Sequence, residues 1–572
     1  MNSPSARLHG LSRSGERYFL APVCLVPNGR AHLGHIAGPL LRMDVLKRHL
    51  RWSGADVAMV ATSDSHESHV AIRGHKEGRT SVEVARDYHE QIRGDLGALL
   101  LEYDDFIDPL SPEWAERYAE VNHALLDAVI AAGSTRIVTD PMPRLTAVPE
   151  GATTPATGPR LGDIVTSGWH QGSCPDCGEG MTGYSCEGCG GLHAPHQVDG
   201  LRPAHFEGEL TFDDVQVLHL DLADGPARLR AAAEAAGVRG DFLALLDRYL
   251  ARNGTDVRLT VPSRWGIPRT DEGLTEEQVV WHGATLQIAC HYLAAERYSE
   301  LTGHPYPLAA GSDVTTVVGF GIDNALPYLV GGLGAILGQD TYKAIDHYLI
   351  NQFYRLDGKK FSTSRRHVIW AGDLVETGGA DPDLARLYLC FRNPEFTSEN
   401  FDPREFVAFH NATAAEVGAG ITEALGLLSG AQAPVDGPVV PSHWERAFLA
   451  AHLERLTSAL GLEGHTVNGA YRVLREWLDR GELLLRTPSG AATYLAGLAH
   501  LALPLMPRFA TALWQHLTGE TSPTLAGLDA VLDAGLDPRR TTAGAPPVLG
   551  RLDAERFAGC VSLDGVTMTT GV

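Results

Sequence analysis

The sequence of 572 residues is 44% hydrophobic and 20% charged, which is typical of a globular protein and too apolar for a disordered one. Its formal net charge of −23 argues against a general binder of polyanions, so any contact with nucleic acid must rest on local patches. The longest apolar run, around 325–337, is interrupted by Pro327 and is too short to cross a bilayer. The N-terminal segment, which begins with residues 1–4, lacks an apolar core of the length that a secretory signal needs. We therefore expect a cytoplasmic enzyme without membrane contact.

The N-terminal part of the chain predicts a βαβ unit. The apolar run 18–29 closes at the turn pair Asn28-Gly29, which predicts a buried strand ending in a tight loop. Residues 33–51 carry apolar side chains at helical spacing, and the apolar run 57–62 predicts a second buried strand. A strand, a helix and a strand in such close succession imply a parallel sheet.

The rest of the chain divides by composition. Between about 137 and 260 the sequence changes to a Pro-, Gly- and Thr-rich stretch followed by a cysteine quartet, which indicates an insertion. Further elements are expected as helices over 81–100 and 112–132, strands over 278–281 and 314–320, and a helix over 324–338 with 342–350 behind it. The expected division is the first half of an α/β domain, the insertion, the second half of that domain, a linking segment, a helical domain and a tail: 1–136, 137–260, 261–365, 366–405, 406–517 and 518–572.

The first chemical motif, His32-Leu33-Gly34-His35, lies where the first strand meets the first helix. A helix N-terminus presents free N–H groups and partial positive charge, which suits a phosphate, and Gly34 lets a ligand approach the backbone. His32 and His35 share a helix face and can both donate to phosphoryl oxygens in a transition state. Taken alone, the pattern is equally compatible with surface or capping histidines.

The second motif is a loop over 357–365 that contains two adjacent lysines. The chain has 42 arginines and only 5 lysines, so the pair Lys359-Lys360 is unexpected by chance. Together with Ser362 and Ser364, these cations can close over a triphosphate and neutralise charge on a departing pyrophosphate. An isolated run of this kind is more often a solvated basic loop, but this one occurs with the histidine motif.

The third motif is a cluster of four of the eight cysteines within sixteen residues: Cys174, Cys177, Cys186 and Cys189. Four thiolates in two Cys-x2-Cys pairs have the spacing of a structural zinc knuckle, in which no position is left open for catalysis. Four buried free cysteines are the less favoured alternative.

The two signature motifs together resemble the paired "HIGH" and "KMSKS" motifs of class I aminoacyl-tRNA synthetases, and more narrowly the sequence resembles the methionyl-tRNA synthetases. The narrower resemblance rests on segments that occur in the same order: Asn28-Gly29, Ser63-Asp64-Ser65-His66, the cysteine quartet, Trp265-Gly266-Ile267-Pro268, Trp281-x-x-Ala284, Gly321-x-Asp323-Asn324 and Asn393-Pro394-Glu395. The resemblance runs from about 18 to 401, and more faintly to about 517.

The resemblance implies a fold and a reaction. It implies a Rossmann-type parallel sheet split by a zinc-bearing insertion and followed by an α-helical bundle. It implies that ATP and an amino acid form an aminoacyl-adenylate and pyrophosphate, and that the acyl group passes to tRNA, with Mg²⁺ on the triphosphate and Zn²⁺ in the knuckle. The catalytic residues would be His32, His35 and Lys360, and the ATP site would comprise Asn28, Gly29, Gly34, Gly321, Asp323, Lys359, Ser362 and Ser364. A monomer or weak dimer is expected.

The amino-acid pocket both keeps and changes residues that the resemblance implies. Asp64, which would pair with the substrate ammonium, and Trp281 and Ala284 are kept. The segment around Cys24 departs from the family, Ile288 stands where a tyrosine is usual, and Tyr328 where a histidine is usual. Methionine or an analogue is the expected substrate, and such changes can retune a pocket for another amino acid.

Two regions beyond the pocket also depart from the family. The second lysine of the signature loop is replaced by Thr363, so that Lys359 or Arg366 would have to supply its charge. In the helical domain, the segment 417–423 offers no arginine, a leucine stands about where an anticodon-reading tryptophan is expected, and from residue 406 onward 11 basic residues face 16 acidic ones. Three alternatives stay open: a divergent methionine–tRNA ligase, a paralogue with another amino acid or acceptor, and a non-catalytic protein on a synthetase scaffold.

Overall fold

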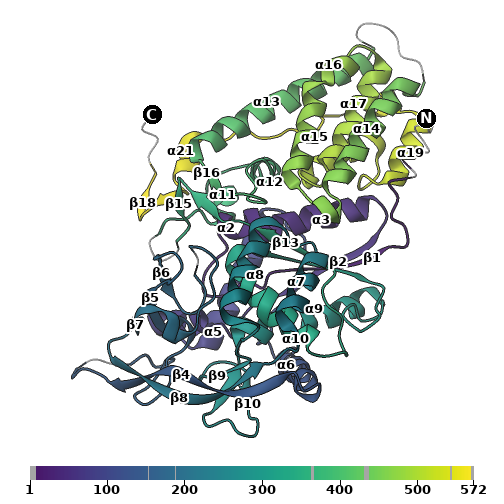
Figure 1. Cartoon of the computed structure of the whole chain (residues 1–572). Helices are drawn as coiled ribbons and strands as arrows, with labels where there is room; N and C mark the ends of the chain where they lie inside the picture. The colour runs from purple at the N-terminus through teal and green to yellow at the C-terminus, as the bar shows by residue number, and fades with distance from the viewer. Residues whose placement is uncertain are drawn as a thin grey trace.

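The computed structural model describes residues 8, 10–151, 154–186, 188–362, 366–430, 437–541 and 544–568, apart from the side chains of 285–287. A helical bundle, a central sheet and a long two-stranded ribbon follow one another from the top to the bottom of the molecule (Figure 1). Within the described part of the chain, no helix is both long enough and apolar enough to cross a membrane.

The central sheet consists of five parallel strands in the order β13-β12-β1-β2-β3. The strands are β1 (Arg17–Pro22), β2 (Asp56–Thr62), β3 (Asp105–Ile107), β12 (Thr315–Gly321) and β13 (His347–Asn351). The predicted βαβ unit and Rossmann-type sheet are confirmed. Strand β3 was not predicted, because it is only three residues long and carries too little pattern. The segment 342–350 was expected to lie behind the helix over 324–338, and this was wrong: most of it that is regular forms β13, which pairs with β12 in the central sheet.

The strand order reverses between β1 and β12. From β1 the chain adds β2 and β3 on one side, and it later adds β12 and β13 on the other. In open parallel sheets a ligand binds at the carboxyl ends of the strands where such a reversal occurs. The loops after β1, β2 and β12 therefore meet at one edge, and these are the loops that carry His32, Asp64 and Asp323.

The helix predicted over 33–51 is interrupted. It forms α2 (Leu33–His35), a π-helical turn η1 (Ile36–Leu40) and α3 (Leu41–Trp52). Gly38 has a non-helical ψ of −111°, and Pro39 follows it, so the helix kinks here. A Cβ on Gly38 would lie 2.4 Å from the amide nitrogen of Asn351 at the end of β13, so only glycine allows this approach.

Helices cover both faces of the sheet and shield its apolar strands. They include α4 (Ser68–Glu77), α5 (Ser81–Ala98), α6 (Ala115–Ala131), α9 (Gln287–Thr302) and α10 (Leu333–Leu337). Thr80 and Glu83 form a capping box at the start of α5. Two more π-helical turns, η4 (His282–Leu286) and η6 (Pro327–Gly332), flank the carboxyl edge of the sheet. Single π-helical turns are common at functional sites.

The insertion leaves the sheet as a long antiparallel ribbon of β4 (Thr135–Ala147) and β8 (Glu209–Leu220). It holds a small sheet of β5 (His170–Ser173), β6 (Gly180–Thr182) and β7 (Asp199–Pro203), and then α7 (Gly225–Ala235) and α8 (Gly240–Asn253). The strand predicted over 278–281 forms as β11 (Gln278–Val280), but it pairs with β9 (Thr260–Pro262) and β10 (Pro268–Arg269) outside the main sheet.

The C-terminal half of the chain is helical. The helices in its described residues are α11 (Ala371–Glu376), α12 (Pro382–Phe391), α13 (Pro403–Leu428), α14 (His443–Ala459), α15 (Val467–Asp479), α16 (Gly481–Leu484), α17 (Pro488–Ala502), α18 (Pro507–Thr518), α19 (Leu525–Ala534), α20 (Pro538–Thr541) and α21 (Ala554–Ala558), besides those of the region before residue 371. The bundle packs on the catalytic part through buried polar contacts. Trp52 of α3 donates to His500 of α17 over 2.8 Å, and Arg42 donates to the carbonyls of Ile350 and His465.

A buried ion pair holds three regions of the chain together. Arg386 of α12 and Asp44 of α3 are both fully buried, and their side chains meet at 2.6 Å. Arg386 also donates to the carbonyls of Leu99, Pro504 and Leu505. Although burial raises the pKa of Asp44, the charges of Arg48 and Arg386 outweigh it and bring that pKa down to about 2.

We predict that Arg386→Met lowers the free energy of unfolding by about 3 kcal/mol, at the low end for a broken buried pair because Arg48 still contacts Asp44. Urea denaturation measures this change. As a control, Arg480→Met removes an exposed pair with Glu476 and should cost less than about 1 kcal/mol. Equal losses in the two variants would contradict the structural role of the Arg386 pair.

Candidate active site

The histidine motif is held rigidly at the carboxyl edge of the sheet. His32 is the N-cap of α2, and its ring stacks on that of His35 with 3.7 Å between centroids. Just before it, Arg30 pairs with Asp95 of α5 at 2.6 Å and with Asp373 of α11 at 2.7 Å. The motif is thus tied to two helices that are far apart in the sequence.

Both imidazoles are neutral at pH 7. Burial, together with the nearby His35 and the charge of Lys360, holds the pKa of His32 well below its usual range. Burial also lowers the pKa of His35 to about 4. The backbone N–H of His32 donates to Nδ1 of His35 over 3.3 Å, so the proton of neutral His35 is on Nε2. The motif can therefore donate hydrogen bonds to a phosphate without placing two like charges side by side.

Gly34 lies between the histidines and the lysine loop. A Cβ at this position would come within 3.0 Å of both the His32 ring and the Phe361 ring. Phe361 in turn stacks on His32 with 4.9 Å between centroids. The two signature motifs, more than three hundred residues apart, are therefore in direct contact through His32 and Phe361.

The lysine loop grows from a small three-stranded sheet. Strand β14 (Tyr354–Leu356) pairs with β15 (Lys359–Lys360) on one side and with β16 (Glu399–Phe401) on the other. Both lysines are exposed, and the charge of Lys360 acts on His32. Ser362 closes the loop by exchanging two backbone hydrogen bonds of 2.9 Å with His367. Ser364, predicted as an ATP contact, lies outside the described residues, as does Thr363.

A hairpin from the C-terminal region contacts this loop. Its strands are β17 (Ser562–Leu563) and β18 (Val566–Thr567), preceded by α21 (Ala554–Ala558). Ser562 exchanges two backbone hydrogen bonds with Val368, and its hydroxyl donates to the carbonyl of Arg366 over 2.6 Å. The carboxylate of Asp564 contacts the ammonium of Lys359. Lys359, which the sequence placed at ATP, is therefore already engaged in an ion pair.

The predicted nucleotide residues lie at the ends of β1 and β12. Asn28 and Gly29 form the bend after β1. Gly321 ends β12, and a Cβ there would lie 2.6 Å from the carboxylate of Asp323. Burial raises the pKa of Asp323 above its usual range. The side-chain oxygen of Asn351, at the end of the neighbouring β13, is buried and has no hydrogen-bond partner among the described residues.

Asp64, the carboxylate predicted to pair with the substrate ammonium, has a partner that the sequence pattern did not single out. Asp64 follows β2 and is fully buried, and Nδ1 of His282 lies 3.1 Å and 3.0 Å from its two oxygens. His282 follows Trp281 directly, within the segment that resembles the methionine pocket. Although burial lowers the pKa of an imidazole, the charge and hydrogen bond of Asp64 outweigh it and raise the pKa of His282 to about 9.

The segments predicted to form the amino-acid pocket bring thiols and phenols together. Cys24 accepts a hydrogen bond from Thr62 at 3.4 Å, and Cys290 lies 3.4 Å from the hydroxyl of Tyr118. The ring of Tyr328 stacks on that of Phe320, and its hydroxyl forms a hydrogen bond of 2.7 Å with Nε2 of His291. Asp64 and Cys24 contribute to raising the pKa of both Tyr118 and Tyr328, so these four side chains lie near one another.

The remaining pocket positions are apolar. Ile288 is fully buried and lies 3.3 Å from the position that a Cβ on Gly332 would occupy. Ala284 is buried against Gly331, where a Cβ would come within 2.5 Å of its Cα. Trp281 is buried, and the ring of Tyr184 meets its edge at 5.1 Å between centroids.

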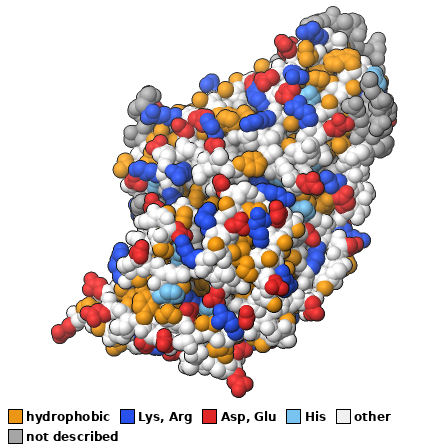
Figure 2. All heavy atoms as spheres, viewed as in Figure 1, with side chains coloured by type: hydrophobic (Ala, Val, Ile, Leu, Met, Phe, Trp, Pro, Cys, Tyr) orange, Lys and Arg blue, Asp and Glu red, His pale blue; other side chains and the backbone are white. Residues whose placement is uncertain are grey.

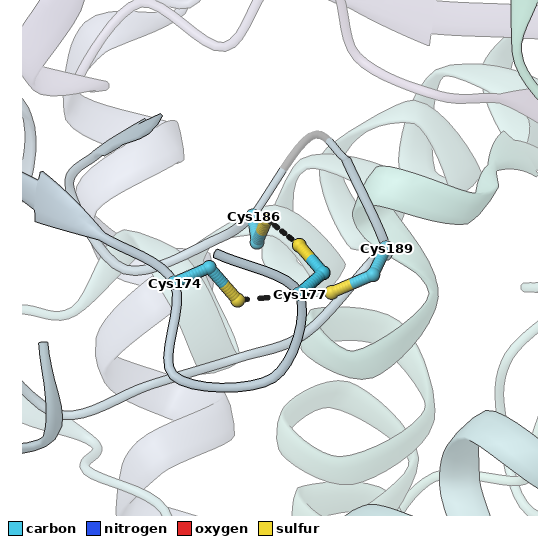
Figure 3. A group of neighbouring side chains, drawn as sticks. All are labelled: Cys174, Cys177, Cys186 and Cys189. Atoms are coloured by element: carbon cyan, nitrogen blue, oxygen red, sulfur yellow. Dashed lines mark hydrogen bonds between the residues drawn. The ribbon is translucent and has the colours of Figure 1, made fainter. Parts of the chain in front are cut away.

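The four predicted zinc ligands converge (Figure 3). All four sulfurs lie within 4.8 Å of one another, with 3.8 Å between Cys174 and Cys189 and 3.6 Å between Cys177 and Cys186. Four sulfurs at about 2.3 Å from a tetrahedral zinc ion are about 3.8 Å apart, so these thiols fit the ion as they stand. His193 approaches the sulfur of Cys174 at 3.3 Å and would act as its hydrogen-bond partner.

The knuckle also packs against residues of the candidate site. The ring of Tyr184 lies 5.9 Å from that of His282, and the hydroxyl of Ser185 donates to the carbonyl of Asp323 over 2.8 Å. Gly190 has a φ of +76°, and a Cβ there would come within 2.9 Å of the Ile322 carbonyl. A metal in the knuckle would therefore stabilise a wall of the active site while remaining outside the reaction.

We predict that Cys177→Ser lowers the zinc content from about one ion per chain to well below half, because a tetrahedral site loses one of its four thiolates. Metal analysis of the purified protein after dialysis against a chelator measures this. The control Cys560→Ser, in a cysteine outside the knuckle, should keep its metal. A full complement of zinc in Cys177→Ser would contradict the site.

We predict that Ser562→Pro speeds backbone hydrogen exchange over 366–368 by about tenfold, because it removes an N–H and a hydroxyl that bond this segment. Mass spectrometry of the peptide that contains the loop measures the rate. Thr567→Ala, at an exposed position of the same hairpin, should leave the rate unchanged. Unchanged exchange in Ser562→Pro would show that the hairpin does not hold the loop.

Comparison with known proteins places this architecture in a family. The family described as "tRNA synthetases class I (M)" matches residues 21–421. A methionine–tRNA ligase of Roseiflexus castenholzii is 28% identical over 400 residues, which cover 66% of this chain and 63% of that protein. Methionine–tRNA ligase 2 of Bacillus cereus is 26% identical over 390 residues, which cover 67% of this chain and 68% of that protein. This chain thus spans about two thirds of the length of these relatives.

A solved structure is similar over nearly the whole chain. The methionyl-tRNA synthetase of Mycobacterium tuberculosis bound by methionyl-adenylate superposes with a TM-score of 0.67, covering 93% of this chain and 99% of that one at 16% identity. At this identity the superposition establishes the fold, including the helical C-terminal region. Since the family match extends over most of the chain, this protein belongs to the methionyl branch, designated M, of the class I tRNA synthetases.

Proposed function

We propose that this protein activates methionine with ATP and transfers the methionyl group to tRNA. The observation that carries the proposal is the contact between the two signature motifs at the carboxyl edge of the sheet, where Phe361 stacks on His32 beside the exposed Lys360. Family membership and relatives named methionine–tRNA ligase support it.

The proposed reaction needs positioning and charge stabilisation rather than a covalent nucleophile. The methionine carboxylate attacks the α-phosphorus of ATP in line, an O–P bond forms, and the bond to pyrophosphate breaks. Neutral His32 and His35 donate hydrogen bonds to the phosphoryl oxygens, and Lys360 balances the charge that develops on pyrophosphate. The 3′ hydroxyl or 2′ hydroxyl of tRNA then attacks the acyl carbon and releases AMP.

Other assignments complete the proposal. Asn28, Gly29 and Gly34 would admit the phosphates to the backbone, and Gly321 and Asp323 would contact the adenosine. Asp64 would face the methionine ammonium, between Trp281 and the wall formed by Cys24, Ile288 and Tyr328. Mg²⁺ would supply charge neutralisation on the triphosphate. We further propose a zinc-bearing knuckle, a cytoplasmic location, and a monomer or weak dimer.

A second candidate, a paralogue with an unusual tRNA or acceptor, is favoured by the helical bundle. Arg475 is paired with Glu416 and Asp479, and Arg480 is paired with Glu476, so these guanidinium groups are engaged within the bundle. Trp477 is fully buried against Tyr494 and cannot stack on a base. On the face shown in Figure 2, basic and acidic side chains are interspersed over the helical part of the molecule.

Two assays separate these candidates. ATP–pyrophosphate exchange with each amino acid in turn identifies the substrate, and exchange driven by methionine supports the main proposal. Charging of bulk tRNA with the same amino acid then tests the acceptor. Methionine-driven exchange without charging of tRNA would favour the second candidate, and exchange driven by another amino acid would refute methionine activation.

We predict that His35→Ala lowers methionine-dependent exchange by about 10²–10³-fold, the effect of removing one donor to a transition-state oxygen, with little change in stability. Steady-state exchange rates measure this, and thermal unfolding checks the fold. His443→Ala, at an exposed position at the start of α14, is the matched control. A normal exchange rate in His35→Ala would contradict the assignment of the histidine motif to the phosphates.

A further inference from the structure

The amino-acid pocket already contains a cation. The carboxylate of Asp64 is fully buried, and His282 lies against both of its oxygens with only 8% of its side chain exposed. With a pKa of about 9, His282 carries a proton at pH 7, so the two groups form a buried ion pair before any substrate arrives.

Each of the two carboxylates that act on His282 is in contact with an imidazole. Glu67, at the start of α4, contacts His69, and its charge and hydrogen bond outweigh burial and raise the pKa of that imidazole. Burial and the charge of His282 lower the pKa of His66 to about 4, so His66 is neutral. Further neighbours among the described residues include the thiol of Cys290 on α9 and the ring of Tyr184 on the knuckle. Among these groups, each of the two carboxylates, Asp64 and Glu67, thus has as its partner an imidazole whose pKa it raises.

A substrate ammonium would disturb this balance. An α-amino acid carries one positive charge at its amino group, and the proposed partner of that charge is Asp64. Burying a further cation beside such a pair is strongly unfavourable unless a charge of the same sign leaves. The group nearest to the incoming ammonium that can give up a charge is His282, through the proton that it shares with Asp64.

We propose that His282 determines how the pocket accepts an amino group: the α-ammonium replaces the His282 imidazolium as the partner of Asp64, and one proton leaves the site. The N–H bond of the imidazolium breaks, its electron pair stays on the ring nitrogen, and the proton passes to solvent. Neutral His282 then lines the pocket. The inference rests on the proposed function only in that an amino acid must bind.

The consequence is selectivity for the amino group itself. A ligand with the methionine side chain and carboxylate but without the amine, 4-(methylthio)butanoate, leaves the Asp64–His282 pair intact. It should bind without releasing a proton. Methionine should bind more tightly as the pH rises from 7 toward 8.5, by about tenfold per pH unit, because its binding releases one proton.

Calorimetric titration of the full-length protein tests this proposal, after exchange assays have identified an amino acid that is activated. L-Methionine, or whichever amino acid drives exchange, is titrated at pH 7.5 in phosphate and in Tris buffer, whose ionisation enthalpies differ. We expect about one proton released in the wild type and none in His282→Gln. The control variant His443→Gln should behave as the wild type. The dissociation constant of His282→Gln should vary less than about twofold between pH 7 and 8.5.

Each outcome decides the matter. If the wild type catalyses ATP–pyrophosphate exchange but releases no proton when the amino acid binds, the inference is overturned and the proposed function stands. Equal release in wild type and His282→Gln would also overturn it, since the proton would come from another group. If His282→Gln does not fold, the wild type alone still decides, because the amine-free analogue must release no proton. If no amino acid drives exchange, both the function and the inference fall.

Discussion

The parallel pairing of five strands, with a reversal of order between β1 and β12, is the constraint on which the site depends. Parallel strands end at the same edge, so loops that are almost three hundred residues apart in the sequence open side by side. His32, Asp64 and Asp323 each follow a different strand of this sheet. The topology of the sheet therefore determines which side chains can meet at the site.

Parts of the chain outside the sheet close the site. The knuckle contributes Tyr184 and Ser185 above the pocket, and the lysine loop reaches His32 through Phe361. The fully buried Arg386–Asp44 pair fixes α12, and with it the bundle, on the helix that follows the histidine motif. A site built in this way requires each peripheral unit to be docked, which makes its geometry cooperative.

The parts of the structure with a strong local signal were predictable from the sequence. The βαβ unit, the cysteine quartet and the two signature motifs are each encoded by neighbouring residues, and the structure brings them together as expected. Strands β3 and β13 are too short to show a period, and the π-helical turn at Gly38 depends on a contact with Asn351 that no local pattern reveals.

The least predictable features are pairs of residues that are distant in sequence. His282 lies inside a recognised segment, yet its role follows from Asp64, 218 positions away. The hairpin that holds the lysine loop has no motif at all, since its contacts are mostly made by backbone atoms and by one carboxylate. Residue propensities and motif spacing predict only the structure of residues that are close in sequence. Contacts between residues that are distant in sequence depend on the folded chain.

The docking of residues 562–565 onto the lysine loop has a consequence for biosynthesis. Ribosomes make this hairpin some two hundred residues after the loop that it supports, and five hundred and thirty after His32. A nascent or prematurely terminated chain that already contains both signature motifs still lacks the support of its loop. The hydrogen bonds that hold residues 366–368 in place therefore form only after nearly the whole chain has been synthesised.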